Sequence, residues 1–134
     1  VAWSLVMMFW MFATRFPAMK RKGISLKGMI GGRGPQLDGV IENSAQWKSH
    51  NYNHLMEQPT LFYAIAIALA LLGKGDVWIN VALAWGYVGL RIAHSLVQAT
   101  VNVVIWRFLL FIAASFCLLG LTVHAAAVVI RASV

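Results

Sequence analysis

Apolar residues fill most of the chain in long runs, and polar residues gather in one extended segment and a few short interruptions. The runs predict helices over residues 1–16, 45–72, 77–101 and 103–130. About 20 helical residues, rising about 1.5 Å each, cross the hydrocarbon core of a bilayer. Since lipid gives the backbone no hydrogen-bond partner, such spans are helical. The pattern therefore predicts an all-α polytopic membrane protein, a single domain over residues 1–134 with a bundle of four transmembrane helices.

The expected helix boundaries lie at proline, glycine and polar residues. Arg15 and Pro17 should end the first helix, because proline lacks a backbone N–H and crowds the preceding turn. Residues 18–44 then form one long polar loop, and residues 73–76 a tight connection. Asn102 marks the turn between the last two helices. The Gly-Gly-Arg-Gly stretch at 31–34 lacks the Gly-Lys-Ser/Thr ending of a phosphate-binding loop, so it predicts a flexible loop and no nucleotide site.

Composition and charge indicate the environment and the orientation of the chain. Of its 134 residues, 60% are hydrophobic and 11% charged, against about 25% charged in soluble domains. The net charge is +7, and six basic residues lie near the end of the first run: Arg15, Lys20, Arg21, Lys22, Lys27 and Arg33. Beside a span, such a cluster is typical of a cytoplasmic loop that faces anionic lipid, not of a nucleic-acid site. We therefore expect loop 18–44 in the cytoplasm, both termini on the non-cytoplasmic side, and residence in a bacterial inner membrane.

Ionisable and amide side chains inside the predicted helices form two stripes. Such groups are costly within a membrane, so each is a candidate for function. The helix over 77–101 carries, at spacings of three, four and four, Arg91, His94, Gln98 and Asn102. The helix over 45–72 carries His50, His54 and Glu57, with Asn53 on an adjoining line. Residues three or four apart share a helical face, so the stripes predict two polar faces.

The two stripes should meet at one level of the membrane. Glu57 lies 16 residues before Gly73 and Arg91 lies 15 residues after Asp76, so both stand about 22–24 Å from the same connection. Adjacent antiparallel helices would bring them together, and we predict an ion pair between Glu57 and Arg91. That pair would either belong to a pocket or only lock the bundle. Arg107, at the start of the last helix, lies on the same side.

The residue types favour an organic zwitterion over a metal. Two arginines and a carboxylate suit a ligand that carries carboxylates and an amine. His54 and Glu57, together with His94, resemble a set of metal ligands, but the neighbouring arginine cations oppose a metal ion, so no metal is expected. No serine has the histidine and aspartate of a nucleophilic triad nearby. Cys117 is the single cysteine, so it is expected to fill space rather than form a disulfide.

Two segments carry a resemblance to a known family. They are N-H-L-M-E-Q-P-T-L-F-Y at 53–63 and L-R-I-A-H-S-L-V-Q-A-T-V-N-V-V-I-W-R-F at 90–108. Together they resemble the MAPEG family, membrane-associated proteins in eicosanoid and glutathione metabolism, over roughly residues 1–131. The Arg-x-x-His-Ser element, with a second arginine sixteen residues after the first, is similar to the microsomal prostaglandin E synthase branch. The resemblance implies a four-helix subunit, a homotrimer, and glutathione bound between neighbouring subunits near the cytoplasmic face.

The resemblance also implies roles for particular side chains. Arg107 matches the family arginine that stabilises the glutathione thiolate, so it is the expected catalytic residue. The expected glutathione-binding residues are Arg91, His94, Glu57, Asn53, His54, Gln98 and Arg15. Among them Glu57 matches the glutamate that meets the glutathione amine, and Arg15 matches an arginine at the end of the first helix.

Departures from the family pattern leave alternatives open. The family's glutathione enzymes carry Arg-x-x-x-Asn-x-x-Glu, whereas here His54 stands three before Glu57 and the arginine is absent; Gln98 replaces a common tyrosine. The resemblance implies a glutathione-dependent transferase or peroxidase that acts on lipophilic electrophiles. The alternative is a non-catalytic membrane subunit or binding protein within a larger complex. A third hypothesis is a small transporter or lipid-binding module that uses the basic loop.

Overall fold

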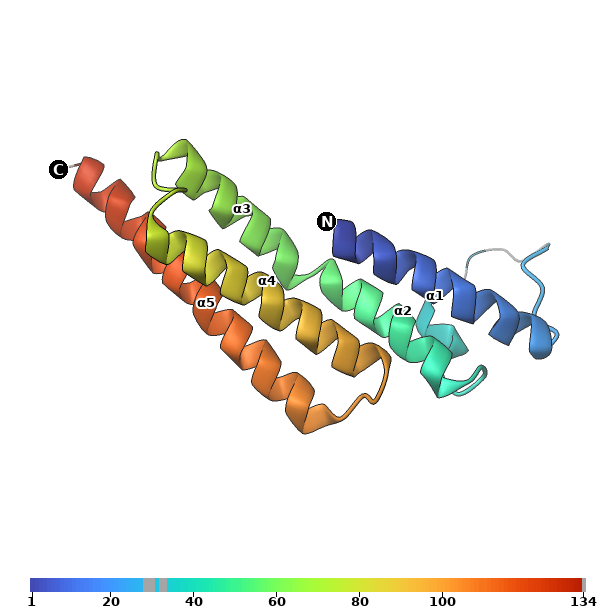
Figure 1. Cartoon of the computed structure of the whole chain (residues 1–134). Coiled ribbons are helices and arrows are strands. Elements are labelled where there is room, and N and C mark those ends of the chain that lie inside the picture. Colours follow the sequence, from blue (N-terminus) through green and yellow to red (C-terminus); the bar gives the residue numbers. More distant parts are fainter. Residues whose placement is uncertain (28–30, 32–33, 134) are drawn as a thin grey trace.

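Helices account for most of the described chain. The computed structural model describes residues 1–27, 31 and 34–133. Its elements are α1 (Ala2–Arg21), the short 3₁₀ helix η1 (Gly34–Leu37), α2 (Asn43–Leu55), α3 (Gln58–Leu71), α4 (Trp78–Ala99) and α5 (Val104–Ala132) (Figure 1). No strand occurs among these residues. The expected all-α class is confirmed. Arg33 and part of the glycine-rich stretch 31–34 lie outside the described residues.

The helices form two packed groups. α4 and α5 run antiparallel along each other, and α3 lies beside them (Figure 1). α1 packs mainly on α2, at the end of the molecule away from the C-terminus, and α2 also contacts α4. Two helical stretches of 29 residues, Asn43–Leu71 and Val104–Ala132, are long and apolar enough to cross a membrane. A polytopic arrangement is therefore supported for these two stretches by length and composition.

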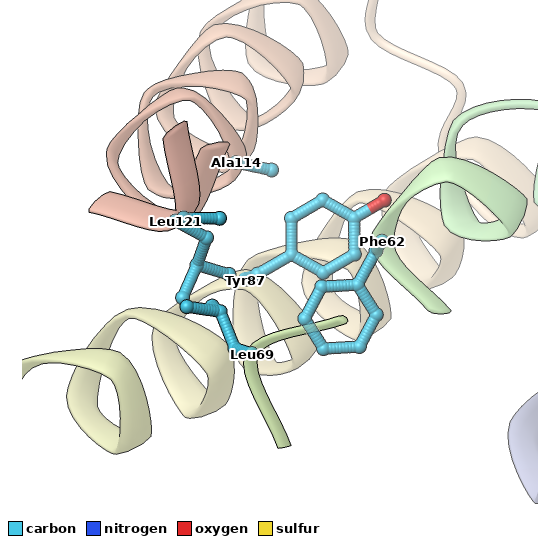
Figure 2. Close-up of a cluster of buried hydrophobic side chains, with 6 residues drawn as sticks. Phe62, Leu69, Tyr87, Ala114 and Leu121 are labelled. Carbon is cyan, nitrogen blue, oxygen red and sulfur yellow. The ribbon is translucent and has the colours of Figure 1, made fainter. Parts of the chain in front are cut away.

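The core of the α3–α5 group is a cluster of apolar side chains around one tyrosine (Figure 2). The rings of Phe62 and Tyr87 stack with their centroids 4.4 Å apart, and Leu69 and Leu121 close the cluster. α4 and α5 approach closely because small residues line the contact: a Cβ on Gly120 would lie 2.9 Å from Leu83 Cδ1. Such close approach raises van der Waals contact between helices in an apolar environment, where no hydrophobic force drives them together.

The predicted end of the first helix at residue 16 is wrong. α1 continues through Pro17 for four further residues, to Arg21. Pro17 is exposed, while Ala18 and Met19 after it are buried against Ile41 and Ala45. Their packing offsets the hydrogen bond that proline removes from the helix. The first residues of the predicted loop 18–44 therefore belong to α1, and the loop is shorter than predicted.

The predicted continuous helix over residues 45–72 is interrupted at Met56 and Glu57. Pro59 stands in the first turn of α3, where its missing N–H costs nothing. In an uninterrupted helix its ring would clash with the carbonyl of Leu55. The backbone instead tightens, with the N–H of Met56 bonded to Asn53 O at 2.9 Å and that of Glu57 to His54 O at 3.4 Å. Glu57 thus lies in a turn, not on a helical face.

The remaining boundaries agree with the prediction within three residues. The α3–α4 connection at 73–76 contains Gly73 at φ 64°, a conformation that favours glycine. The α4–α5 turn contains Asn102 at φ 52°, with its N–H bonded to Val97 O at 2.7 Å. Asparagine tolerates this left-handed region better than most residues. The interpretation of Asn102 as the turn residue is confirmed.

A hydrogen-bond network ties α1 and α2 to α4, and so joins the two groups. Ser95 Oγ on α4 accepts from Trp3 Nε1 at 2.9 Å and from Asn51 Nδ2 at 2.7 Å. Asn51 and Ser95 are fully buried. Three helices therefore meet at one hydroxyl, one turn from the polar stripe of α4.

Candidate functional site

A small hollow lies where α2, α4 and α5 meet. Its volume is about 240 Å³, and it is lined by His54, His94, Val104, Arg107, Phe108 and Phe111. The polar members come from three helices that are separated in sequence. The expected meeting of the two stripes at one level is therefore confirmed for His54 and His94.

Three rings, tilted against one another, form the floor of the hollow. The His54 and His94 ring centroids are 5.0 Å apart, and Phe111 lies 5.6 Å from His54 and 6.4 Å from His94. His94 is buried, while His54 is partly exposed. Ring contacts of this kind fix the imidazole planes. The hollow thus presents two imidazole rings and the phenyl rings of Phe108 and Phe111 to a ligand.

Arg107 stands at the edge of this hollow on the first turn of α5. Its Nη1 donates to Asn102 Oδ1 at 2.7 Å, so the turn residue positions the guanidinium. Its Nε is buried and has no hydrogen-bond partner among the described residues. A guanidinium carries five N–H donors and keeps its charge under all physiological conditions. Arg107 therefore has donors left for an anion.

Arg91 lies behind the hollow rather than in it. Its side chain is 4% exposed, and its Cζ lies 5.5 Å from the centroid of Phe111 and 5.9 Å from that of Tyr87. None of its three guanidinium nitrogens has a hydrogen-bond partner among the described residues. Contact with aromatic faces stabilises a cation only partly, so this is an incompletely compensated charge.

The predicted ion pair between Glu57 and Arg91 is wrong. Glu57 is 69% exposed, and its carboxylate lies 3.8 Å from His54 Nε2. The interruption before Pro59 turns this side chain away from α4. Glu57 therefore borders the hollow only through its contact with His54.

The other predicted site residues are dispersed. Asn53 is exposed on α2, and Gln98 is buried on α4 with its Oε1 unpaired among the described residues. Arg15 lies in a different region, where it donates to Ser49 Oγ at 2.8 Å and to Gly34 O at 3.2 Å. Within one chain, the structure thus brings together His54, His94 and Arg107, and leaves Arg15 apart.

Two polar contacts that support the hollow were missed in the sequence. Gln58 Nε2 donates to Ser115 Oγ at 2.8 Å, and Ser115 Oγ donates to Phe111 O at 2.8 Å. These bonds join the start of α3 to α5 beside the phenyl floor. In the sequence, Gln58 and Ser115 are a glutamine and a serine that each stand next to apolar residues. They are 57 positions apart, so no local pattern indicates that they pair. Among the described residues, no group of three metal-ligating side chains could hold a metal ion.

The loop end of the molecule has its own ionic contacts. Asp38 Oδ1 accepts from the Gln46 amide and lies 3.0 Å from His50 Nε2. The Gln46 hydrogen bond, with the nearby His50 and Arg15 charges, lowers the pKa of Asp38 below its usual range against the effect of burial. Glu42 likewise has a lowered pKa, because Arg21 Nε donates to it at 3.0 Å. These contacts hold the segment around η1 to α2 and are remote from the hollow.

Fold and hollow together define an α-helical membrane protein with a basic, aromatic site between helices. The chain matches the model of the MAPEG family over residues 1–127 of its 134, and it belongs to that family. This is a family of membrane proteins that includes glutathione transferases, and its members generally use glutathione. Membership and the two apolar helical stretches indicate an integral membrane protein. No curated protein and no solved structure matches the chain.

Proposed function

We propose that this protein is a glutathione-dependent transferase or peroxidase that acts on lipophilic electrophiles, with Arg107 as its catalytic residue. The observation that supports this most is the position of Arg107. Its guanidinium is held by Asn102 at the edge of a hollow that also contains His54 and His94, and its Nε has no partner among the described residues. A cation with free donors in this setting favours an anion beside it.

Glutathione fits the donor set of the chain. Its carboxylates suit guanidinium groups, and the described structure contains one buried arginine, Arg91, whose nitrogens have no partner. Bound glutathione would supply a thiol whose anion attacks the electrophile. A thiol has a pKa of about 8.5, and the Arg107 guanidinium would favour the anion near neutral pH. His54 and His94 would shape the pocket and orient the ligand, with Glu57, Asn53, Gln98 and Arg15 as further binding residues.

The hollow of one chain supplies only part of such a site. Small-molecule sites span about 300–1,000 Å³, and this hollow measures about 240 Å³. A homotrimer would supply the missing wall and bring Arg15 of a neighbouring subunit within reach of the ligand. The chain would be a single domain with four spans in a bacterial inner membrane, the basic loop in the cytoplasm and both termini outside.

A lipophilic substrate would enter from the bilayer. The first turns of α5 expose Val104, Trp106 and Phe108 beside Arg107. Val104 and Phe108 also line the hollow. An apolar approach that ends at a guanidinium suits an apolar electrophile and an anionic nucleophile.

The test is the ultraviolet absorbance of the glutathione thiolate in the purified full chain. On addition of glutathione the native protein should show the thiolate band, and Arg107→Ala should lose it. Arg131→Ala is the matched control, because Arg131 is exposed in the last turn of the same helix. A thiolate band of unchanged size in Arg107→Ala would remove Arg107 from the mechanism.

A second candidate is a non-catalytic membrane subunit or binding protein that keeps the fold without glutathione. The position of Glu57 favours it, since this carboxylate is 69% exposed and, in the part of the chain that the structure describes, its one ion-pair contact is with His54. Thermal unfolding in millimolar glutathione separates the two. A ligand that binds only the folded state raises the unfolding temperature. A rise favours the transferase, and no rise favours the non-catalytic subunit.

A further inference from the structure

Two adjoining hollows lie at the loop end of α1, away from the His54–Arg107 site. One, of about 440 Å³, is lined by Phe16, Met19, Lys20, Gly23, Ile24, Ser25 and Leu26. The other, of about 420 Å³, shares three of these residues and continues along α1 past Phe12 and Met11. They are joined at Phe16, Met19 and Leu26. The second hollow also contains Arg15, whose guanidinium is bonded to Ser49 and Gly34. The pair therefore forms one long depression, with Lys20 at one end and a mostly apolar wall along α1 at the other.

The apolar end is a track of phenylalanines on the surface of α1. Phe9, Phe12 and Phe16 follow helical spacings of three and four and share one face. Phe12 and Phe16 stack with centroids 5.5 Å apart. Phe16 is 50% exposed and Leu26 57% exposed. Exposed apolar side chains in a row, beside a hollow of this length, suit a hydrocarbon chain.

The basic end carries lysines without an ion pair in the described part of the chain, although the charge of Lys22 contributes to the lowered pKa of Glu42. Lys20, Lys22 and Lys27 are exposed, and none forms an ion pair within the described part of the chain. The chain has four carboxylates. Three are engaged elsewhere, Glu42 with Arg21, Asp38 with His50 and Glu57 with His54, and Asp76 lies in the α3–α4 connection. The lysines at the end of α1 can therefore pair with an anion from outside the chain.

The turn after α1 places the lysines beside the track. Gly23, at φ 68°, reverses the chain, and Ile24 N–H bonds to Met19 O at 3.0 Å. Leu26 thereby returns to the wall that Phe16 and Met19 begin. Lys20 lines the hollow, and Lys22 follows as the C-cap residue of α1. A hydrocarbon chain in the track would therefore have its head near the end of α1, at Lys20 and close to Lys22.

We propose that this depression binds one molecule of an anionic phospholipid, with the phosphate at Lys20 and Lys22 and an acyl chain along Phe16 and Phe12. The chain belongs to a family of membrane proteins, so phospholipid surrounds it. Charge complementarity selects an anionic head over a zwitterionic one, because each juxtamembrane lysine contributes about fivefold to binding of anionic lipid. The depression contains Arg15, which is among the proposed glutathione-binding residues, but the lysines and phenylalanines that would bind the lipid are not.

The test uses the purified full chain in zwitterionic detergent, with bound lipid counted by native mass spectrometry. Dioctanoyl phosphatidylglycerol should bind one per chain and more tightly than dioctanoyl phosphatidylcholine. The double variant Lys20→Gln, Lys22→Gln should weaken phosphatidylglycerol about 25-fold, at about fivefold per lysine. Phe16→Ala should weaken both lipids. Lys74→Gln is the control, since Lys74 is exposed in the α3–α4 connection, and it should leave binding unchanged.

Three results would overturn the proposal. Equal affinity for the two lipids would mean that the lysines do not select the head. An equal loss in Lys74→Gln and in the double variant would mean a diffuse effect of net charge. Displacement of phosphatidylglycerol by millimolar inorganic phosphate would mean a site for free phosphate without a lipid track.

Discussion

The α4–α5 pair and the α1–α2 pair are held together by different interactions. Between α4 and α5 the contact is mostly apolar, with close approach at Gly120 and a tyrosine buried next to α3; one polar pair, His124 Nδ1 with Asn80 Oδ1 at 2.7 Å, adds to it. Between α1 and α2 the hydrogen bond of Arg15 with Ser49 adds to the packing, and Ser95 on α4 accepts from Trp3 on α1 and from Asn51 on α2. The first pair therefore depends mainly on apolar packing, whereas polar side chains contribute more to holding α1 and α2. The candidate hollow lies where the two kinds of contact meet, with α2 on one side and α4 and α5 on the other.

This difference explains why the side chains on one side of the hollow are held by packing, whereas those on the other side lie next to an interruption of the helix. His94 and Phe111 belong to the apolar pair and are fixed by its packing. His54 and Glu57 belong to α2 and the turn after it, where Pro59 interrupts the helix. A ligand that needs both sides would therefore find one wall rigid and the other adjustable. The following substitutions separate the two contributions.

The largest effect is expected from Tyr87→Ala in the apolar pair. Tyr87 is 2% exposed and stacks on Phe62, so its removal leaves a cavity between α3, α4 and α5. We expect a loss of about 3 kcal/mol in the free energy of unfolding, typical of large aromatic truncation in a core. Denaturant unfolding in detergent measures it. Trp85→Ala, 71% exposed on the same helix, should change little; equal losses in the two variants would mean that the core does not carry the stability.

A smaller and more local effect is expected from Ser95→Ala at the joint between the groups. Trp3 Nε1, which is half-buried, and Asn51 Nδ2, which is fully buried, would both lose their acceptor, at a cost of about 2 kcal/mol. Hydrogen exchange should rise along α1 and stay unchanged in α5. Thr122→Ala is the control, because its hydroxyl bonds only within its own helix. Increased exchange in α5 as well would mean that the two groups open together, against the division made above.

The sequence predicted the helices of the α4–α5 pair more accurately than those of the α1–α2 pair. Helices α4 and α5 were predicted within three residues because each is a long, mostly apolar stretch bounded by a short turn. The predicted end of α1 came too early, because the packing of Ala18 and Met19 on Ile41 and Ala45 outweighs the loss of a helical hydrogen bond at Pro17. That packing depends on residues more than 20 positions away and has no local signal. The break at Met56 and Glu57 did have a local signal. Pro59 follows Glu57 by two residues, and a proline at that place excludes an uninterrupted helix through the two residues.

The candidate site was predicted in part for a related reason. Helical spacing and depth were enough to place His54 and His94 at one level. They assumed that α2 was straight through Glu57, so the ion pair with Arg91 failed with that assumption. Asn102 was identified as a turn residue, but its bond to Arg107 depends on a left-handed backbone conformation that spacing does not specify. The roles of these residues towards glutathione stay predictions.

The smallest effect, a pH-dependent one, concerns the segment that joins α1 to α2. The lowered pKa of Asp38 means that its ionised form stabilises the docking of η1 on α2. This stability is complete above the usual carboxyl pKa of about 3.9 and is lost as the pH falls through the lower pKa of the folded state. We expect the side-chain amide resonances of Gln46 to shift over that acidic range in an NMR titration. His50 and Arg15 face the same carboxylate as cations and favour its ionised form.

Asp38→Asn provides the matched control, because the amide oxygen still accepts from Gln46 but has no proton to gain. In that variant the Gln46 resonances should show no acidic transition. Tyr87→Ala should leave the transition of the native protein in place, since the core of α3, α4 and α5 has no part in it. A transition that persists in Asp38→Asn would place the titrating group elsewhere. A transition abolished by Tyr87→Ala would instead mean that the polar contacts of α1 and α2 form only on an intact apolar pair, which would make the second group dependent on the first.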